Sequence, residues 1–355
     1  MRTFHVNRAW LAAGFVAVLS LAAAGIAGSL NPPAGPPAPT FKTLHDVEPR
    51  TIITQADIPL SITTRGSYYL GENLIPAMNT NMPIIEILTD DVTVNLEGFT
   101  IDGTDGIRQS LSAVKVIGPM NNVSIRNGIV RDCTSAGIEA FVPGPVRGVT
   151  IEDITSYNNQ LMGMRASHAL IRNCVAYSNA LAGIEAQDGS LIESCLVYDN
   201  GQEGIVAGPG STVINCTSRS NTKTGIFAAN GSTVRSNTSS FNTGDGILVT
   251  ADCYVIDNTC NSNGQGLGSG AGVFVLGADC RIDGNLVTDN DRGIDVDISG
   301  NLIIRNSASG NATQYLITAN NKVGTIVSAP NSLAINGSTG GAGVGTTNPW
   351  ANISY

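Results

Sequence analysis

The stretch Ser211–Asp252 contains two successive copies of one pattern, STVINCTSRSNTKTGIFAAN (residues 211–230) and GSTVRSNTSSFNTGDGILVTAD (residues 231–252). When the second copy is laid over the first at a shift of 21 residues, Asn242 falls on Asn221 and Gly246 falls on Gly225. Short apolar runs with a period of two lie between these fixed points. A constant period of about 20–50 residues is the mark of a repeat protein, so the stacking of these units decides the fold.

The same frame extends in both directions from this stretch. A Gly followed by an aliphatic residue recurs at intervals of 20, 21 or 26 residues, at Gly137-Ile138, Gly163-Met164, Gly183-Ile184, Gly204-Ile205, Gly225-Ile226, Gly246-Ile247, Gly272-Val273 and Gly293-Ile294. An Asn lies three to four residues before most of these Gly, and another strand supplies a column of Ile and Val from Ile125 to Ile303. The longer intervals are insertions between units, so the repeated core is kept intact along the chain.

Units of this length, with two or three short strands separated by Gly or Asn corners, are typical of a parallel β-helix. Gly and Asn accept the left-handed backbone conformation that tight corners require. One unit cannot bury its apolar side, whereas about ten stacked rungs make a continuous core. We therefore predict an all-β chain that forms a single-stranded solenoid over residues 92–324. An N-terminal cap at 46–91 and a C-terminal tail at 325–355, which holds Trp350, complete the prediction.

The repeats carry a resemblance to a known family. The segments SNTSSFNTGDGILV (236–249) and RIDGNLVTDNDRGIDVDISGNLIIRNSASGN (281–311) resemble right-handed parallel β-helix repeats of the pectate-lyase-like superfamily. The chain as a whole resembles a group of exported bacterial β-helix proteins. The resemblance implies a right-handed parallel β-helix, but it implies no single activity, because that superfamily includes lyases, hydrolases, epimerases and proteins without known catalysis.

The N-terminus differs in composition from the repeats. Arg2 and Arg8 flank an uncharged run from Ala9 to Leu30 that contains small residues suited to cleavage. We expect residues 1–27 to be a signal peptide, or an N-terminal membrane anchor if they are not removed, since the run is long enough to span a bilayer. Residues 28–45 are a Pro-rich linker. The protein is therefore expected to be secreted or held at the cell surface, in a periplasmic or extracellular location.

The charge and the cysteines limit the partners and cofactors. The formal net charge is −9, and because phosphate binding needs clustered Lys and Arg, we expect no nucleic-acid partner. The seven cysteines show no CxxC spacing of the kind that binds zinc. Cys253 and Cys280 occupy equivalent positions in adjacent rungs, about 4.8 Å apart. They are the pair that would form a disulfide if the chain has one.

Three tyrosines form an outward column on successive rungs, Tyr157, Tyr177 and Tyr198, and Arg219 follows them at the same position. Stacked phenol rings on a rigid face could form a platform for sugar rings, and Arg219 could hold the carboxylate of a uronate. Simple cross-strand stacking is the alternative explanation. This column is the candidate substrate-binding site for a polysaccharide or a cell-envelope component.

The most acidic patch is the segment DRGIDVD at residues 291–297. Period-two alternation places Asp295 and Asp297 on one outward face, which could begin a Ca²⁺ site made of oxygen ligands. In β-helix polysaccharide lyases, as the resemblance implies, Ca²⁺ neutralises a uronate carboxylate while a basic side chain removes the C5 proton. Arg292 is the basic residue of this patch, so Arg292, Asp295 and Asp297 are the candidate catalytic residues. Solvating or structural Asp residues are the alternative.

A further outward column changes character along the chain. It reads Arg108, Glu139, Arg165 and Glu185 in the early rungs, where alternating charges predict ion pairs between rungs. In later rungs it becomes an apolar stripe of Val206, Phe227, Leu248 and Phe274. Such a stripe should not face water unattended, so we expect the C-terminal tail to cover it, or a ligand or partner to bind there.

These observations favour one function and leave two alternatives. The sequence contains no Gly-x-Ser-x-Gly or HExxH motif and no complete acid–base constellation. The first hypothesis is an exported, non-enzymatic β-helix that presents a face to polysaccharide or to the cell envelope. The alternative is a lyase-like or epimerase-like enzyme that acts on an acidic, uronate-containing polysaccharide, with Ca²⁺ as its cofactor. A structural or adhesive surface repeat protein is the second alternative.

Overall fold

The computed structural model describes residues 49–76, 82–104, 111–141, 146–264, 270–328 and 346–355. Residues 50–355 form one unit. The expected signal peptide or anchor at 1–27, the linker at 28–45 and Arg108 lie outside the described residues. Within the described ranges, no helix is long and apolar enough to cross a membrane. The single short helix described is the 3-10 turn η1 (Gln55–Asp57).

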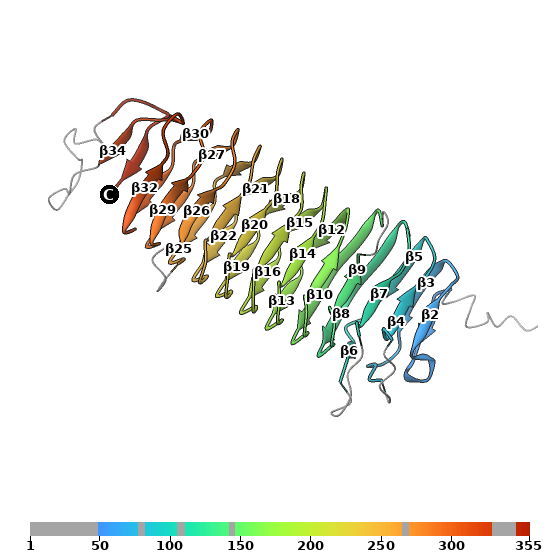
Figure 1. Ribbon diagram of the computed structural model, residues 1–355. Coiled ribbons are helices and arrows are strands. Elements are labelled where there is room, and N and C mark those ends of the chain that lie inside the picture. The colour runs from blue at the N-terminus through green and yellow to red at the C-terminus, as the bar shows by residue number, and fades with distance from the viewer. Residues whose placement is uncertain (1–48, 77–81, 105–110, 142–145, 265–269, 329–345) are drawn as a thin grey trace, which may run out of the picture. The chain divides into compact units, whose positions relative to one another are not determined.

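One face of the unit is sheet B, in which neighbouring strands are parallel and in register. Its twelve described strands are β2 (Leu60–Ile62), β4 (Ile85–Ile87), β7 (Val114–Val116), β9 (Ile138–Ala140), β11 (Met164–Ala166), β14 (Ile184–Ala186), β17 (Ile205–Ala207), β20 (Ile226–Ala228), β23 (Ile247–Val249), β26 (Ala271–Val275), β29 (Arg292–Val296) and β32 (Thr313–Ile317). Each strand comes from a different rung, so the sheet runs along the whole solenoid (Figure 1).

Sheet A wraps the remaining faces, and most rungs contribute two strands to it. Its 23 described strands are β1 (Thr51–Ile53), β3 (Gly66–Leu70), β5 (Val92–Asn95), β6 (Thr100–Asp102), β8 (Val123–Arg131), β10 (Val149–Tyr157), β12 (Ala169–Arg172), β13 (Val175–Tyr177), β15 (Leu191–Glu193), β16 (Leu196–Tyr198), β18 (Thr212–Ile214), β19 (Thr217–Arg219), β21 (Thr233–Arg235), β22 (Thr238–Ser240), β24 (Tyr254–Ile256), β25 (Thr259–Asn261), β27 (Arg281–Asp283), β28 (Leu286–Thr288), β30 (Leu302–Ile304), β31 (Ser307–Ser309), β33 (Lys322–Val323), β34 (Ile326–Ser328) and β35 (Asn352–Ser354). In β8 and β10 the two strands of a rung are continuous.

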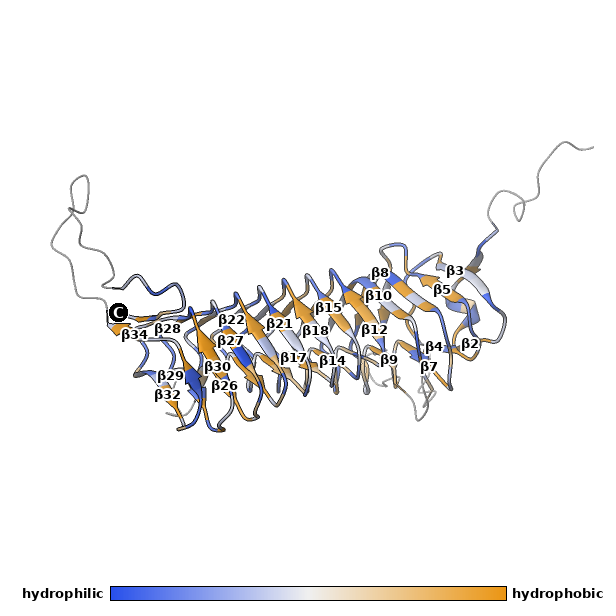
Figure 2. Ribbon diagram, turned by 90° about the horizontal axis from the view of Figure 1, so that it is seen from above, coloured by the Kyte–Doolittle hydropathy of each residue, from blue (hydrophilic) through white to orange (hydrophobic). Residues whose placement is uncertain are grey.

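The all-β, right-handed parallel β-helix predicted from the repeats is confirmed. The inward columns are buried, and the strands carry most of the hydrophobic residues while the turns are hydrophilic (Figure 2). The rungs differ from the prediction at the N-terminal end. Strands β1 to β4 already pair in parallel with the strands that follow, so the described residues between 50 and 91 build the first rungs instead of a separate cap.

Two ladders of Asn side chains join the rungs inside the corners. In the first, each amide nitrogen donates to the Oδ1 of the Asn one rung further on, over 2.8–3.0 Å, along Asn159, Asn179, Asn200, Asn221, Asn242, Asn263, Asn290 and Asn311. The second runs from Asn237 to Asn306 and is completed by Asn352. These bonds satisfy polar groups that are shielded from water, which explains why the corners keep Asn.

The repeated Gly before each sheet B strand has a steric cause. Gly225 does not have a positive φ. A Cβ built on it would lie 2.1 Å from Oγ of Ser239 and 2.5 Å from Nδ2 of Asn242, the ladder residue of the next rung. Gly210 and Asp252 lie at a different corner, before the first sheet A strand of a rung. They take the left-handed conformation predicted for tight corners, with φ values of 67° and 60°. Gly is therefore needed for close approach in one corner and for backbone conformation in the other.

All seven cysteines are buried free thiols. Cys253 and Cys280 do occupy equivalent positions in adjacent rungs, as predicted, and the backbone N–H of Cys253 donates to Sγ of Cys280 over 3.4 Å. The disulfide considered for this pair is not formed. The column Cys174, Cys195 and Cys216 leads directly into the second Asn ladder, because the N–H of Cys216 donates to Oδ1 of Asn237.

Candidate functional site

The three tyrosines stack on each other along sheet A. The ring centroids of Tyr157 and Tyr177 are 4.8 Å apart with planes inclined by 9°, and those of Tyr177 and Tyr198 are 4.9 Å apart with planes inclined by 2°. The register of β10, β13 and β16 places them directly opposite one another. We call these residues and Arg219, which faces Tyr198 on β19, the tyrosine column.

This stacking changes what the column can offer to a ligand. Both faces of the Tyr177 ring are covered by its neighbours, so the column presents ring edges and hydroxyl groups, not the flat platform suggested by the sequence. Burial raises the pKa of Tyr177, and the adjacent Tyr157 and Tyr198 raise it further. The Tyr177 hydroxyl therefore remains protonated at neutral pH. A row of phenol hydroxyls can both donate and accept hydrogen bonds.

The two ends of the tyrosine column are cationic. Arg131 lies 6.0 Å from the centroid of Tyr157 and forms ion pairs with Asp102 and Asp132, so its charge is compensated. Arg219 is exposed and has no ion-pair partner among the described residues. A guanidinium of this kind is available to a carboxylate from outside the chain.

Ion pairs bridge neighbouring rungs on both sheets, and the pairing predicted for the column of Arg165 and Glu185 is found on sheet B. On sheet A, Arg172 pairs with Glu152 over 2.7 Å. On sheet B, Arg165 pairs with Glu185 over 3.2 Å. Glu139 pairs with Lys115, whose position in this column the sequence reading missed. These pairs bridge adjacent rungs at the surface, so they support register more than function.

The structure separates Asp295 from Asp297. The register places Asp295 between Phe274 and Leu316 on the outer side of sheet B, yet its side chain is fully buried, whereas Asp297 is exposed. Asp295 forms an ion pair with Arg292, and its two oxygens have no hydrogen bond of acceptable geometry among the described residues. Burial raises the pKa of Asp295, and the pairing with Arg292 offsets this only in part.

Within the described residues, no further side chains join Asp295 and Asp297 to form a set of metal ligands. No group of three or more His, Cys, Asp or Glu side chains within the described residues is placed to hold a metal ion. The nearby Asp245 accepts a hydrogen bond from the N–H of Ala271 over 2.7 Å, so it is committed to the backbone. The prediction of Ca²⁺ at Asp295 and Asp297 therefore stays a prediction that solution measurements must test.

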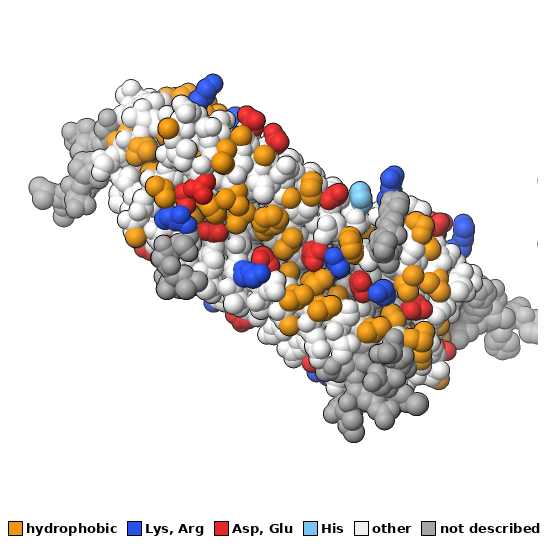
Figure 3. Space-filling model, in the orientation of Figure 1, with side chains coloured by type: hydrophobic (Ala, Val, Ile, Leu, Met, Phe, Trp, Pro, Cys, Tyr) orange, Lys and Arg blue, Asp and Glu red, His pale blue; other side chains and the backbone are white. Residues whose placement is uncertain are grey.

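The apolar stripe lies on sheet B, where hydrophobic side chains run along the middle of the visible face among scattered charges (Figure 3). The described tail residues do not cover it. Strand β35 pairs with β31 and β34, so this part of the tail extends sheet A at the end of the solenoid. The remaining tail residues, 329–345, lie outside the described residues.

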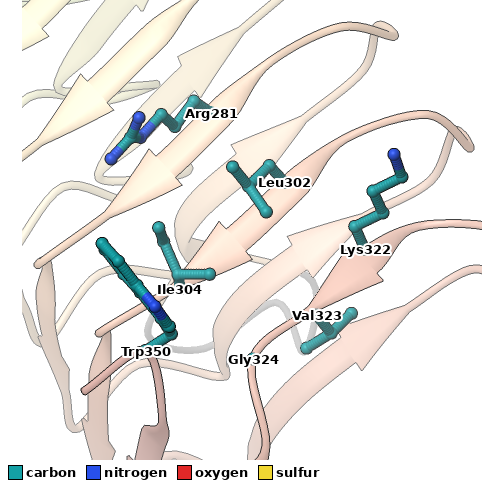
Figure 4. Close-up of a pocket in the computed structure, with 7 residues that line it drawn as sticks. All are labelled: Arg281, Leu302, Ile304, Lys322, Val323, Gly324 and Trp350. Atoms are coloured by element: carbon teal, nitrogen blue, oxygen red, sulfur yellow. The ribbon is translucent and has the colours of Figure 1, made fainter. Parts of the chain in front are cut away.

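A groove with a volume of about 390 Å³ lies at this end of sheet A, and the sequence reading missed it. Leu302 and Ile304 form its floor, Trp350 stands at one side and Lys322 at the other (Figure 4). Arg281 borders the groove and holds Asp283 together with Arg305. The one sequence signal was Trp350 in a tail otherwise poor in aromatic residues.

The comparisons with known proteins agree with this geometry. The family model for the right handed beta helix region matches residues 85–213 and 205–352, so the chain belongs to the right-handed β-helix family. The right-handed parallel β-helix that the repeats resemble is thereby confirmed. A search of curated proteins found no significant match.

Solved structures share the fold at low sequence identity. The A-module of the mannuronan C-5 epimerase AlgE4 from Azotobacter vinelandii aligns with a TM-score of 0.56 and 16% identity over 73% of this chain and 91% of that chain. The surface adhesin PfbA of Streptococcus pneumoniae aligns at 0.57 and 12% over 75% and 82%. A mutant of the periplasmic alginate epimerase AlgG aligns at 0.51 and 11% over 86% and 76%.

Proposed function

We propose that this protein binds a polysaccharide along the outer face of sheet A and that it does so without catalysis. The observation that carries the proposal is the tyrosine column. Its three hydroxyl groups lie at rung spacing, and it ends in Arg219, which has no ion-pair partner in the described part of the chain. A stack of rings whose faces are already covered has little freedom to lose on binding, so its hydroxyls are preorganised. Support also comes from the fold, which it shares with alginate epimerases and a surface adhesin.

The chemistry of recognition follows from the column. Sugar hydroxyls can exchange hydrogen bonds with the phenol groups of Tyr157, Tyr177 and Tyr198, and the carboxylate of a uronate can pair with Arg219. The polysaccharide would then be acidic. Export suits this function, since residues 1–27 are expected to direct the chain to the periplasm, the cell surface or the medium.

The test is a variant that removes the hydroxyls and keeps the stack. In the full-length chain, Tyr157→Phe, Tyr177→Phe and Tyr198→Phe together should weaken binding of an acidic polysaccharide by at least about tenfold, because three hydrogen bonds are lost. Isothermal titration calorimetry measures the affinity, and Tyr69→Phe, near the N-terminal end of sheet A and away from the tyrosine column, is the matched control. Unchanged affinity of the triple variant would reject the column as the binding site.

One observation favours an enzyme as the second candidate. A fully buried carboxyl with a raised pKa beside a guanidinium, as in Asp295 and Arg292, is the kind of perturbed pair found at catalytic sites. An epimerase-like or lyase-like enzyme would use Asp295 as a proton donor or acceptor and Arg292 to neutralise the uronate. Incubation with uronate polysaccharides and Ca²⁺ should then release unsaturated products or alter the uronate composition, and Asp295→Asn should stop this. Wild-type protein that leaves every substrate unchanged would exclude the enzyme.

A further inference from the structure

An exposed tryptophan, Trp350, forms one side of the groove at the C-terminal end of sheet A. Trp350 remains 51% exposed, although an indole in a monomeric protein gains by burial. Its ring and Lys322 stand on opposite sides of an apolar floor made by Leu302 and Ile304 (Figure 4). The volume of about 390 Å³ lies within the range of about 300–1,000 Å³ that is usual for small-molecule sites.

The chain fixes Trp350 in this position with several contacts. The N–H of Trp350 donates to Oδ1 of Asn348 over 2.9 Å, and Asn352 joins the Asn ladder through Asn306. A Cβ on Gly324 would lie 2.0 Å from the carbonyl oxygen of Trp350, so Gly is what allows the tail to pack against β33. The exposed indole is therefore held on a backbone anchored from both sides and is not the end of a loose tail.

The charges at the groove are positive in a chain of net charge −9. Arg281 and Lys322 line it, and the guanidinium of Arg305 lies 5.6 Å from the centroid of the Trp350 ring. Arg281 is committed to Asp283, to which it donates over 2.7 Å, and Arg305 donates to the same carboxylate over 2.6 Å. Lys322 is exposed and has no ion-pair partner among the described residues, so it is the cation available to a ligand.

We propose that this end groove is a second glycan subsite that takes one acidic sugar residue, whose ring packs against Trp350 and whose carboxylate pairs with Lys322. The inference rests on the proposed function and extends it to a site about five rungs beyond Tyr198, or about 24 Å along the solenoid. Aromatic rings bind the apolar faces of sugars, and an ammonium group pairs with a carboxylate, so the groove matches a uronate in both respects. A second copy of this chain is a poorer fit, because it would bring Lys322 against Lys322 or against an already paired arginine.

Trp350 provides a direct readout of this subsite. The chain has two tryptophans, so Trp10→Phe in the full-length protein leaves Trp350 as the single one. A galacturonate oligosaccharide should change its fluorescence in a saturable manner, and the fully methyl-esterified oligosaccharide, which lacks the charge, should bind at least about tenfold more weakly. Lys322→Gln, an exposed change that does not disturb the core, should remove that discrimination. Arg219→Gln should leave the Trp350 signal in place.

Each other outcome rejects the inference. Calorimetry could detect binding that Arg219→Gln abolishes while the fluorescence of Trp350 does not change on addition of the oligosaccharide. That result would reject the subsite at the groove and leave the proposed function supported. If the charged and the esterified oligosaccharides change the Trp350 fluorescence equally in the protein with wild-type Lys322, the groove does not select an acidic sugar. If neither binds by any readout, both the subsite and the proposed function fail. Sedimentation that shows a dimer dissociated by Trp350→Ala would assign the groove to a second copy.

Discussion

At the scale of single residues, two fully buried aspartates, Asp283 and Asp295, show how neighbouring cations set the pKa of a carboxyl group. Burial raises the pKa of Asp283, but hydrogen bonds from Arg305 and Arg281 outweigh it and hold the pKa below its usual value. Burial also raises the pKa of Asp295, where Arg292 is the single cation paired with it among the described residues. Asp283 therefore stays ionised in the folded protein at neutral pH, whereas the pKa of Asp295 is shifted in the opposite direction, above its usual value.

Asp283→Asn should destabilise the protein at neutral pH. Because its pKa is depressed in the fold, Asp283 contributes stability above the unfolded pKa of about 3.9, and this is lost as the pH falls through the folded pKa. The free energy of unfolding should drop by about 2 kcal/mol at pH 7, less than for a fully enclosed pair because both arginines are partly exposed. Urea unfolding at pH 7 and pH 3 measures this.

The difference between wild type and Asp283→Asn should narrow at pH 3. Asp297→Asn, which changes an exposed aspartate nearby in the sequence, is the control and should have little effect at either pH. If the difference in the free energy of unfolding stays constant or grows on acidification, the ion pairs of Asp283 with Arg281 and Arg305 do not stabilise the fold.

The sequence predicted the residues of the tyrosine column but not its geometry. Register alone placed Tyr157, Tyr177 and Tyr198 opposite one another, because a parallel β-helix repeats each position at rung spacing. The tilt of the rings depends on side-chain packing, which no repeat pattern specifies. The burial of Asp295 was missed for the same reason, since period-two alternation states the direction of a side chain and not what covers it.

At the scale of elements, each rung is held by its corners as well as by its strands. The first Asn ladder and the repeated Gly before each sheet B strand depend on each other. The Asn side chain of one rung occupies the space that the Gly of the preceding rung leaves free. The sequence showed both columns, but only the structure shows why they occur together. A β-helix of this design tolerates insertions between rungs and not substitutions at this corner.

Gly225→Ala should cost far more stability than Gly210→Ala. At Gly225 the new Cβ would collide with Ser239 and Asn242, and relief would break ladder bonds, so we expect a loss of about 3 kcal/mol or more. Gly210 has a positive φ but nothing within 4 Å of the added Cβ, so the expected loss is about 1 kcal/mol. Chemical denaturation of both variants at one pH compares them directly. Equal losses would contradict the role of close approach.

At the scale of the whole molecule, the two ends and the long faces of the solenoid have different tasks. A stack of parallel strands must end somewhere, and an uncovered end presents unpaired backbone groups to other chains. Here the described tail residues close the end, because β35 pairs with β31 and Asn352 completes an Asn ladder. The sequence predicted a tail that returns to the solenoid but not which sheet it joins, since that choice depends on a few contacts without a repeat.

Removal of residues 346–355 should expose this end. The midpoint of thermal unfolding should fall by several degrees, and the protein should self-associate through the uncovered edge of β31. Calorimetry and sedimentation measure the two effects. Tyr355→Ala, an exposed change at the chain end, is the control that should leave both unaltered. A truncated chain with the same stability and the same state of association as the full chain would show that the tail does not cap the solenoid.

The central claim is that an acidic polysaccharide binds along sheet A, and a crystal structure of the full-length protein with a uronate oligosaccharide tests it most directly. The predicted result is a sugar chain that contacts the hydroxyls of the tyrosine column, with a carboxylate at Arg219. An oligosaccharide bound instead over the apolar stripe and Asp295 on sheet B, with the tyrosine column empty, would contradict it.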